Sequence, residues 1–83
     1  MDKAEIMKRL ADAVAEGDDE LTVELTKKAV DAGMEPVHII NDGLTIGINV
    51  VGERFEAGEY FLPDLLLGAK AMEAGINILE PLM

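Results

Sequence analysis

The sequence contains no cysteine, no tryptophan and a single histidine. Without cysteine, neither a disulfide framework nor a thiolate metal site can form. The N-terminus has no basic segment followed by an apolar run and a cleavage site, so the sequence predicts a cytoplasmic protein without a secretory signal. No uncharged apolar run is long enough to cross a bilayer, and a membrane-spanning helix is not expected.

Basic residues are also few. Seven lysines and arginines stand against 17 acidic residues, which gives a net charge of −10. The basic residues are dispersed along the chain, so they form no patch that could bind phosphates. The charge pattern therefore predicts that the protein binds neither nucleic acid nor an anionic membrane surface.

The first two helices are predicted by periodic apolar residues between capping residues. The first covers about residues 3–16, begins after Asp2 and ends at Gly17; the second covers about 19–32, between Asp18 and Gly33. The expected core positions of both are Ile6, Met7, Leu10 and Val14, then Leu21, Leu25, Ala29 and Ala32.

A long third helix is predicted from Pro36 to Gly58. Its expected core stripe is Val37, Ile40, Leu44, Ile48, Val51 and Phe55. The alternative is a strand from Ile46 to Val51, because β-branched residues are dense there and glycines weaken a helix. In the helical interpretation, Gly43 and Gly47 allow a neighbouring helix to approach closely.

The fourth helix is predicted to begin at Pro63. Its expected stripe is Leu65, Ala69, Met72, Ile76, Leu79 and Met83. Four helices joined by short connections predict an all-α, up-down four-helix bundle that forms one domain over residues 1–83.

All three aromatic residues, Phe55, Tyr60 and Phe61, lie between the last two helices. A small domain normally places its aromatic residues in its core, so this corner, residues 52–64, predicts a specialised apolar surface for a flat ligand or a partner. Tyr60 and Phe61 are expected to anchor the corner itself.

The sequence contains little that supports a catalytic or metal-binding site. Glu35 and His38 have the Glu-x-x-His spacing of di-iron bundles, but such a site needs a second copy of the motif and His38 is the only histidine. We therefore expect His38 near solvent or half buried, and no metal site. The acidic residues of the corner, Glu53, Glu56, Glu59 and Asp64, are expected to form a solvated rim. Catalysis by this chain alone is not expected.

Five short motifs carry a resemblance to a known family. They are Gly33-Met34-Glu35-Pro36, Asn41-Asp42-Gly43-Leu44, Val51-Gly52-Glu53-Arg54-Phe55, Phe61-Leu62-Pro63 and Ala71-Met72. Together they resemble the N-terminal helical cap domain of corrinoid proteins, over essentially the whole chain. That family includes the cobalamin-binding module of methionine synthase and the corrinoid proteins of methanol, methylamine and methoxyarene methyltransferase systems.

The resemblance implies a helical cap that covers the upper face of a corrinoid cofactor and shields the methyl group on its cobalt. By position in the family, Phe55, Leu62 and Leu65 would lie against that face. The implied partners are a Rossmann-like corrinoid-binding domain and methyltransferase subunits. That domain and its D-x-H-x-x-G motif are not present in this sequence, so corrinoid binding is expected to need both parts.

Two other interpretations remain open at this stage. Phe55 and Leu62 could simply hold the last two helices together. The chain could also be a free-standing helical module for dimerisation or protein interaction, and in isolation we expect it to form a homodimer through its apolar corner.

Overall fold

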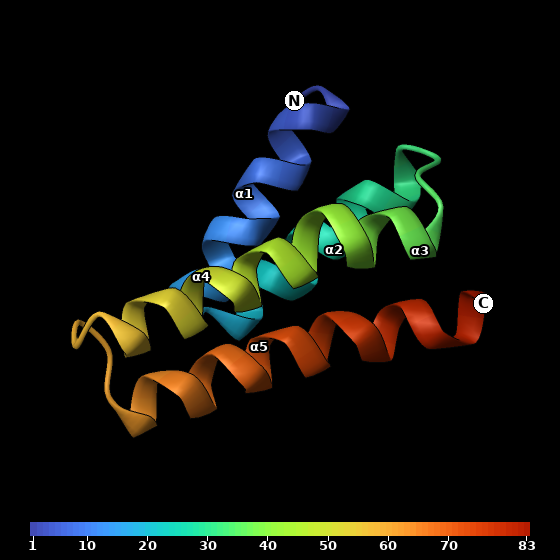
Figure 1. Cartoon of the computed structure of the whole chain (residues 1–83). Helices are drawn as coiled ribbons and strands as arrows, with labels where there is room; N and C mark the ends of the chain where they lie inside the picture. The colour runs from blue at the N-terminus through green and yellow to red at the C-terminus, as the bar shows by residue number, and fades with distance from the viewer.

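The computed structural model describes all 83 residues and contains only helices and short connections (Figure 1). The two N-terminal helices are α1, Lys3–Ala15, and α2, Asp19–Asp31. A short helix α3, Pro36–Ile39, continues through a π-helical turn η1, Ile40–Leu44, into α4, Thr45–Glu56. The longest helix is α5, Leu62–Leu79, followed by the 3₁₀ turn η2, Glu80–Leu82. The predicted all-α four-helix bundle is confirmed, and the alternative strand from Ile46 to Val51 is excluded.

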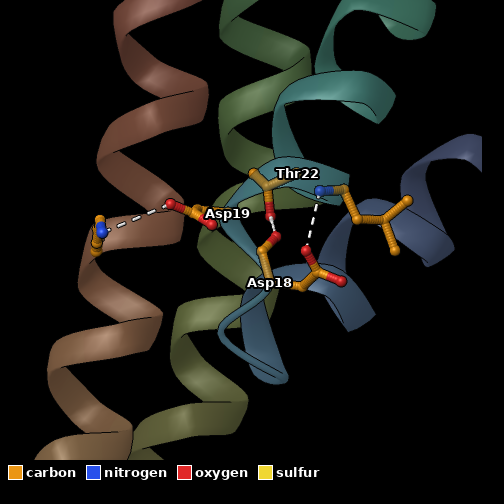
Figure 2. A network of polar contacts seen from close by, with 5 residues as sticks. Asp18, Asp19 and Thr22 are labelled. Atoms are coloured by element: carbon orange, nitrogen blue, oxygen red, sulfur yellow. Dashed lines mark hydrogen bonds and ion pairs between the residues drawn. The ribbon is translucent and has the colours of Figure 1, made fainter.

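The helix ends lie where the capping residues predicted them. Gly17, Gly33 and Gly58 all adopt positive φ at the ends of helices, a conformation that residues with side chains rarely adopt. At the start of α2, Asp18 Oδ1 accepts a hydrogen bond from the Leu21 N–H at 3.0 Å (Figure 2). The Thr22 hydroxyl donates to the Asp18 carbonyl oxygen at 2.7 Å in the same view. The first of these bonds satisfies one of the N–H groups that the start of a helix otherwise leaves without a partner.

The helices α1 and α5 each pack against both α2 and α4. Around the bundle, the order is therefore α1, α2, α5, α4, with α2 and α4 on a diagonal. In Figure 1, α4 and α5 run side by side from the turn at the left, and α1 crosses α4 obliquely. An ion pair between Asp19 Oδ2 and Lys70 Nζ, 3.7 Å apart, also joins α2 to α5 at the surface (Figure 2).

Glycines allow the helices to pack closely. A Cβ atom on Gly47 would lie 2.5 Å from the Ala11 carbonyl oxygen of α1, and one on Gly43 would lie 2.8 Å from Leu10 Cδ2. This confirms that Gly43 and Gly47 admit a neighbouring helix. On α5, Gly68 and Gly75 face Val51 and Leu44 in the same way. The helix α4 is thus held closely between α1 and α5.

The core matches the predicted stripes best in α1, where all four expected residues are buried. In α2, Leu25 and Ala29 are buried, but Leu21 and Ala32 are exposed. In α5, Leu79 is buried, whereas Ala69 and Met83 are exposed and the remaining predicted residues are partly buried. The closest packing on α5 is made by smaller residues between them: Gly68, Ala71 and Gly75.

The third predicted stripe is wrong at both ends: Phe55 at its end is 44% exposed, and its beginning is shifted by one position. Val37 is exposed, and Ile39 occupies the core in its place. The reason is the π-turn, in which the Thr45 N–H donates to the Ile40 carbonyl oxygen, five residues earlier. One extra residue in that turn shifts the helical phase, so Ile39 and Leu44 face the core together although they are five residues apart.

Candidate functional site

Large apolar side chains are exposed on both sides of the turn between α4 and α5. Phe55, near the end of α4, is 44% exposed, and Leu62, the first residue of α5, is 62% exposed. Leu65 is partly buried one turn further along α5, and Leu66 beside it is exposed. The spacing of three and four residues places these three leucines on one face of α5. The structure therefore brings Phe55, Leu62 and Leu65 to one end of the bundle, at the left of Figure 1.

Tyr60 anchors this corner, as the sequence predicts. Its hydroxyl donates to the Ala15 carbonyl oxygen at 2.8 Å and accepts from Arg54 Nη1 at 2.8 Å. The Arg54 guanidinium carbon also lies 5.3 Å from the centre of the Tyr60 ring. The hydrogen bond to Tyr60 is the main reason that the pKa of Arg54 is raised above its ordinary value.

The same prediction is wrong for Phe61, whose side chain is 69% exposed. Phe61 is the N-cap of α5 and has an extended backbone, so its ring projects away from the bundle. Its backbone contributes to the corner instead, since the Phe61 N–H donates to Asp64 Oδ2 at 2.9 Å. That bond gives Asp64 a capping role at the start of α5.

The other acidic residues of the corner, Glu53, Glu56 and Glu59, are exposed, as expected for a solvated rim. No group of three or more His, Asp or Glu side chains lies close enough together to hold a metal ion. The surface between these charges consists of unreactive hydrocarbon, which suits contact with an apolar ligand rather than acid or base chemistry.

His38 lies in α3, at the opposite end of α4 from the corner (Figure 1). Its Nδ1 lies 2.8 Å from Asp42 Oδ2, and both side chains are more than half exposed. It borders a shallow cavity of about 520 Å³ between the start of α1 and the α2–α3 connection. The expectation of a solvent-facing histidine is confirmed.

Sequence reasoning missed both hydrogen bonds of the Tyr60 hydroxyl. The Ala15 carbonyl oxygen binds a tyrosine that is 45 residues away in the chain. The Arg54 to Tyr60 bond spans the glycine turn, and only its spacing of six residues could have suggested it.

The model of the B12 binding domain family matches residues 6–80 of this chain. The chain belongs to this family. The match covers α1 from Ile6 onward, α2 to α5 and the corner. No helix combines the length and the apolar character needed to span a membrane.

Two curated relatives, both from species of Methanosarcina, are similar to this chain over almost its whole length. Trimethylamine corrinoid protein 1 of Methanosarcina mazei is 46% identical over 81 residues, which are 98% of this chain and 38% of that protein. Monomethylamine corrinoid protein 2 of Methanosarcina acetivorans is 41% identical over the same share of this chain and 37% of its own length. This chain therefore spans less than two fifths of the length of the relatives that it matches.

Solved structures agree with the sequence relatives. The monomethylamine corrinoid protein of Methanosarcina barkeri superposes with a TM-score of 0.90 at 40% identity, covering 93% of this chain and 36% of that chain. The methanol:cobalamin methyltransferase complex of Methanosarcina barkeri gives a TM-score of 0.86 at 34% identity, over 93% of this chain and 30% of that one. The fold and the association with a corrinoid cofactor that the resemblance implied are confirmed at the level of the family.

Proposed function

We propose that this bundle covers the upper face of a corrinoid cofactor and shields the methyl group on its cobalt in a methyl-carrier protein. The observation that carries the proposal is the exposed apolar surface at the α4–α5 corner, in a chain of the B12-binding family. The lid residues are Phe55, Leu62 and Leu65. When bound, the corrinoid supplies the cobalt that carries the methyl group.

The lid residues fit such a group chemically. Phenylalanine and leucine have no hydrogen-bonding group, acid or nucleophile, so they can exclude water from one side of a ring without reacting with what it carries. Phe55 and Leu62 are 44% and 62% exposed, which leaves much of their surface free for a ligand rather than for holding the helices together. This favours the lid over a purely structural role for the two residues.

The remainder of the site is proposed to come from outside these residues. The single histidine of the bundle, His38, lies in α3, at the opposite end of α4 from the corner, so a histidine ligand to the cobalt would have to come from another domain. We infer a Rossmann-like corrinoid-binding domain in that role, and methyltransferase subunits as partners. The likeness to a methanol:cobalamin methyltransferase complex supports this second inference.

The experiment joins this chain to the remainder of trimethylamine corrinoid protein 1 of Methanosarcina mazei, in place of the 81 residues that it matches. The hybrid is loaded with methylcobalamin, and the lifetime of the cobalt–carbon bond is measured under light. Phe55→Ala and Leu62→Ala should shorten that lifetime while the helical circular dichroism is retained, because water and oxygen then reach the cobalt more easily. Val37→Ala is the matched control, since Val37 is also about half exposed but lies in α3, away from the corner.

Wild-type lifetimes in both corner variants, combined with much earlier melting, would overturn the lid and favour the structural role of Phe55 and Leu62. The second candidate function, a helical module for dimerisation, is favoured by the same exposed surface. It predicts that the hybrid binds corrinoid no better, and protects it no better, than the Methanosarcina remainder alone.

A further inference from the structure

The proposed lid residues stand directly next to the hydrogen-bonded residues of the corner. Phe55 follows Arg54, and Leu62 lies two residues after Tyr60. Besides its guanidinium, Arg54 contributes its carbonyl oxygen, which accepts from the N–H groups of Glu59 at 2.9 Å and Tyr60 at 3.1 Å. One arginine therefore holds the turn through its backbone and through its side chain.

The Tyr60 hydroxyl connects this turn to a distant helix. Ala15 is the last residue of α1, where the carbonyl groups of a helix run out of N–H partners. Tyr60 supplies a donor to that carbonyl and accepts one from Arg54, so both hydrogen-bonding functions of its hydroxyl are used. A chain of three groups thus runs from the end of α1 through Tyr60 to α4.

The turn after α1 also packs against α5, at Leu67. Gly17 has a φ of +71°, and a Cβ atom on it would lie 2.7 Å from Leu67 Cβ. The position of α5 next to the lid is therefore set at the same point of α1 at which Tyr60 is bound. Two contacts therefore join α5 and the corner to the C-terminal end of α1 and the turn that follows it: the packing of Leu67 against Gly17 and the hydrogen bond from Tyr60 to Ala15.

We propose that Tyr60 and Arg54 are positioning residues of the lid: their hydrogen bonds to each other and to the Ala15 carbonyl hold Phe55 and Leu62 in the arrangement that covers the corrinoid. This inference rests on the proposed function. The two residues touch no cofactor themselves, and they act by reducing the freedom of the turn that carries the lid. Such fixing of a contact surface before binding lowers the conformational entropy lost on binding.

The first measurement uses the isolated chain and the substitution Tyr60→Phe, which keeps the ring and removes both hydrogen bonds of the hydroxyl. Exchange of the backbone amide hydrogens at positions 59 and 60 should become roughly two- to tenfold faster, as expected when a net stabilising hydrogen bond is lost from a local opening equilibrium. Arg54→Lys keeps a donor and should give a smaller effect than Arg54→Met. Unchanged exchange at these amides in Tyr60→Phe would overturn the proposal.

The matched control is Thr26→Val. It also removes one hydroxyl-to-carbonyl hydrogen bond, the 2.7 Å bond from Thr26 Oγ1 to Thr22 O, but from a buried site that faces Gly75, near the C-terminal end of α5. This variant should leave exchange at Glu59 and Tyr60 unchanged. An equal acceleration in Thr26→Val would mean that general loss of stability, and not the corner contacts, controls the turn.

The second measurement uses the methylcobalamin-loaded hybrid. Tyr60→Phe should shorten the lifetime of the cobalt–carbon bond under light. The effect of Phe55→Ala should be smaller in the Tyr60→Phe background than alone, because a lid that is already displaced shields the cobalt less. Faster loss in Phe55→Ala but not in Tyr60→Phe would leave the lid standing and overturn the positioning role. Wild-type lifetimes in Phe55→Ala and Leu62→Ala would overturn the proposed function, and the positioning role with it.

Discussion

At the scale of single residues, a leucine side chain has different roles in the core and at the surface of this bundle. Leu25 in α2 is 3% exposed within the core, and Leu66 in α5 is 63% exposed near the corner. Burial of a leucine side chain removes apolar surface from water and fills space that the surrounding residues cannot close by themselves. Only the first of these two leucines should therefore contribute strongly to the stability of the fold.

Leu25→Ala should lower the free energy of unfolding by about 2 to 5 kcal/mol, the range for large-to-small changes in a core. Leu66→Ala, the control with the same chemical change, should shift it by about 0.5 kcal/mol or less, as for other exposed positions. Chemical denaturation monitored by circular dichroism measures both values. Equal losses in the two variants would contradict the assignment of Leu25 to the core.

The residues that could be predicted were those whose role follows from local spacing. Leu25 follows from the periodicity of its own helix, and Asp18 follows from its position before that helix. Phe61 could not be placed in this way, because an aromatic residue beside a turn can face either the bundle or the solvent. Its exposure depends on its N-cap position and extended backbone, which are set by the start of α5.

At the scale of the helices, glycines determine how closely they pack. Gly47 faces the backbone of α1, where an added Cβ would meet the Ala11 carbonyl oxygen at 2.5 Å and Val14 Cβ at 2.7 Å. Gly52 lies in the same helix, and an added Cβ there meets nothing within 4 Å. A methyl group at the first site must push two helices apart, whereas the second site has free space.

Gly47→Ala should therefore destabilise the bundle, since separation of α1 and α4 opens voids along their whole contact. Gly52→Ala should stabilise it by about 0.5 to 1 kcal/mol, because alanine favours the helix and restricts the unfolded chain. Thermal unfolding of the two variants should shift in opposite directions. A stabilised Gly47→Ala variant would show that α1 and α4 are not in close contact.

The helix boundaries were accessible from the sequence because capping residues and stop glycines act locally. The π-turn was not, since nothing in the residues Ile40–Leu44 distinguishes it from an ordinary helical turn. Its consequence, the burial of both Ile39 and Leu44, is visible only in the packed bundle. The order of the helices around the bundle likewise depends on contacts between distant segments.

At the scale of the whole molecule, a net charge of −10 accompanies an exposed apolar end. Contiguous apolar surface favours burial against another molecule, and the like charge of two copies opposes their approach. The isolated chain should form a two-fold dimer through its corner, more weakly at low salt than at moderate salt, because salt screens the repulsion.

Sedimentation at several salt concentrations measures this dimer, and Leu62→Glu should abolish it by placing a charge in the contact. Glu24→Gln, which reduces the charge on α2 away from the corner, serves as the control and should preserve it. A chain that stays monomeric at high concentration in moderate salt, or a dimer that tolerates Leu62→Glu, would contradict the prediction.

Much of the candidate site could be anticipated, because a short run of residues carries both the aromatic corner and the family motif. Phe55 and Leu62 lie at one end of the bundle, as the sequence suggested. The contact of Tyr60 with Ala15 could not be anticipated, since it joins residues from opposite halves of the chain and depends on how α1 crosses α4.

The π-turn also bears on how chains of different length can share this fold. Removal of one residue between Ile39 and Leu44 would reduce their separation from five residues to four, which is the spacing of an ordinary helical face. A relative that is one residue shorter here would keep the same two side chains in the core and would run as an uninterrupted helix. An alignment gap inside this helical segment would therefore mark a change of local winding and no loss of the bundle.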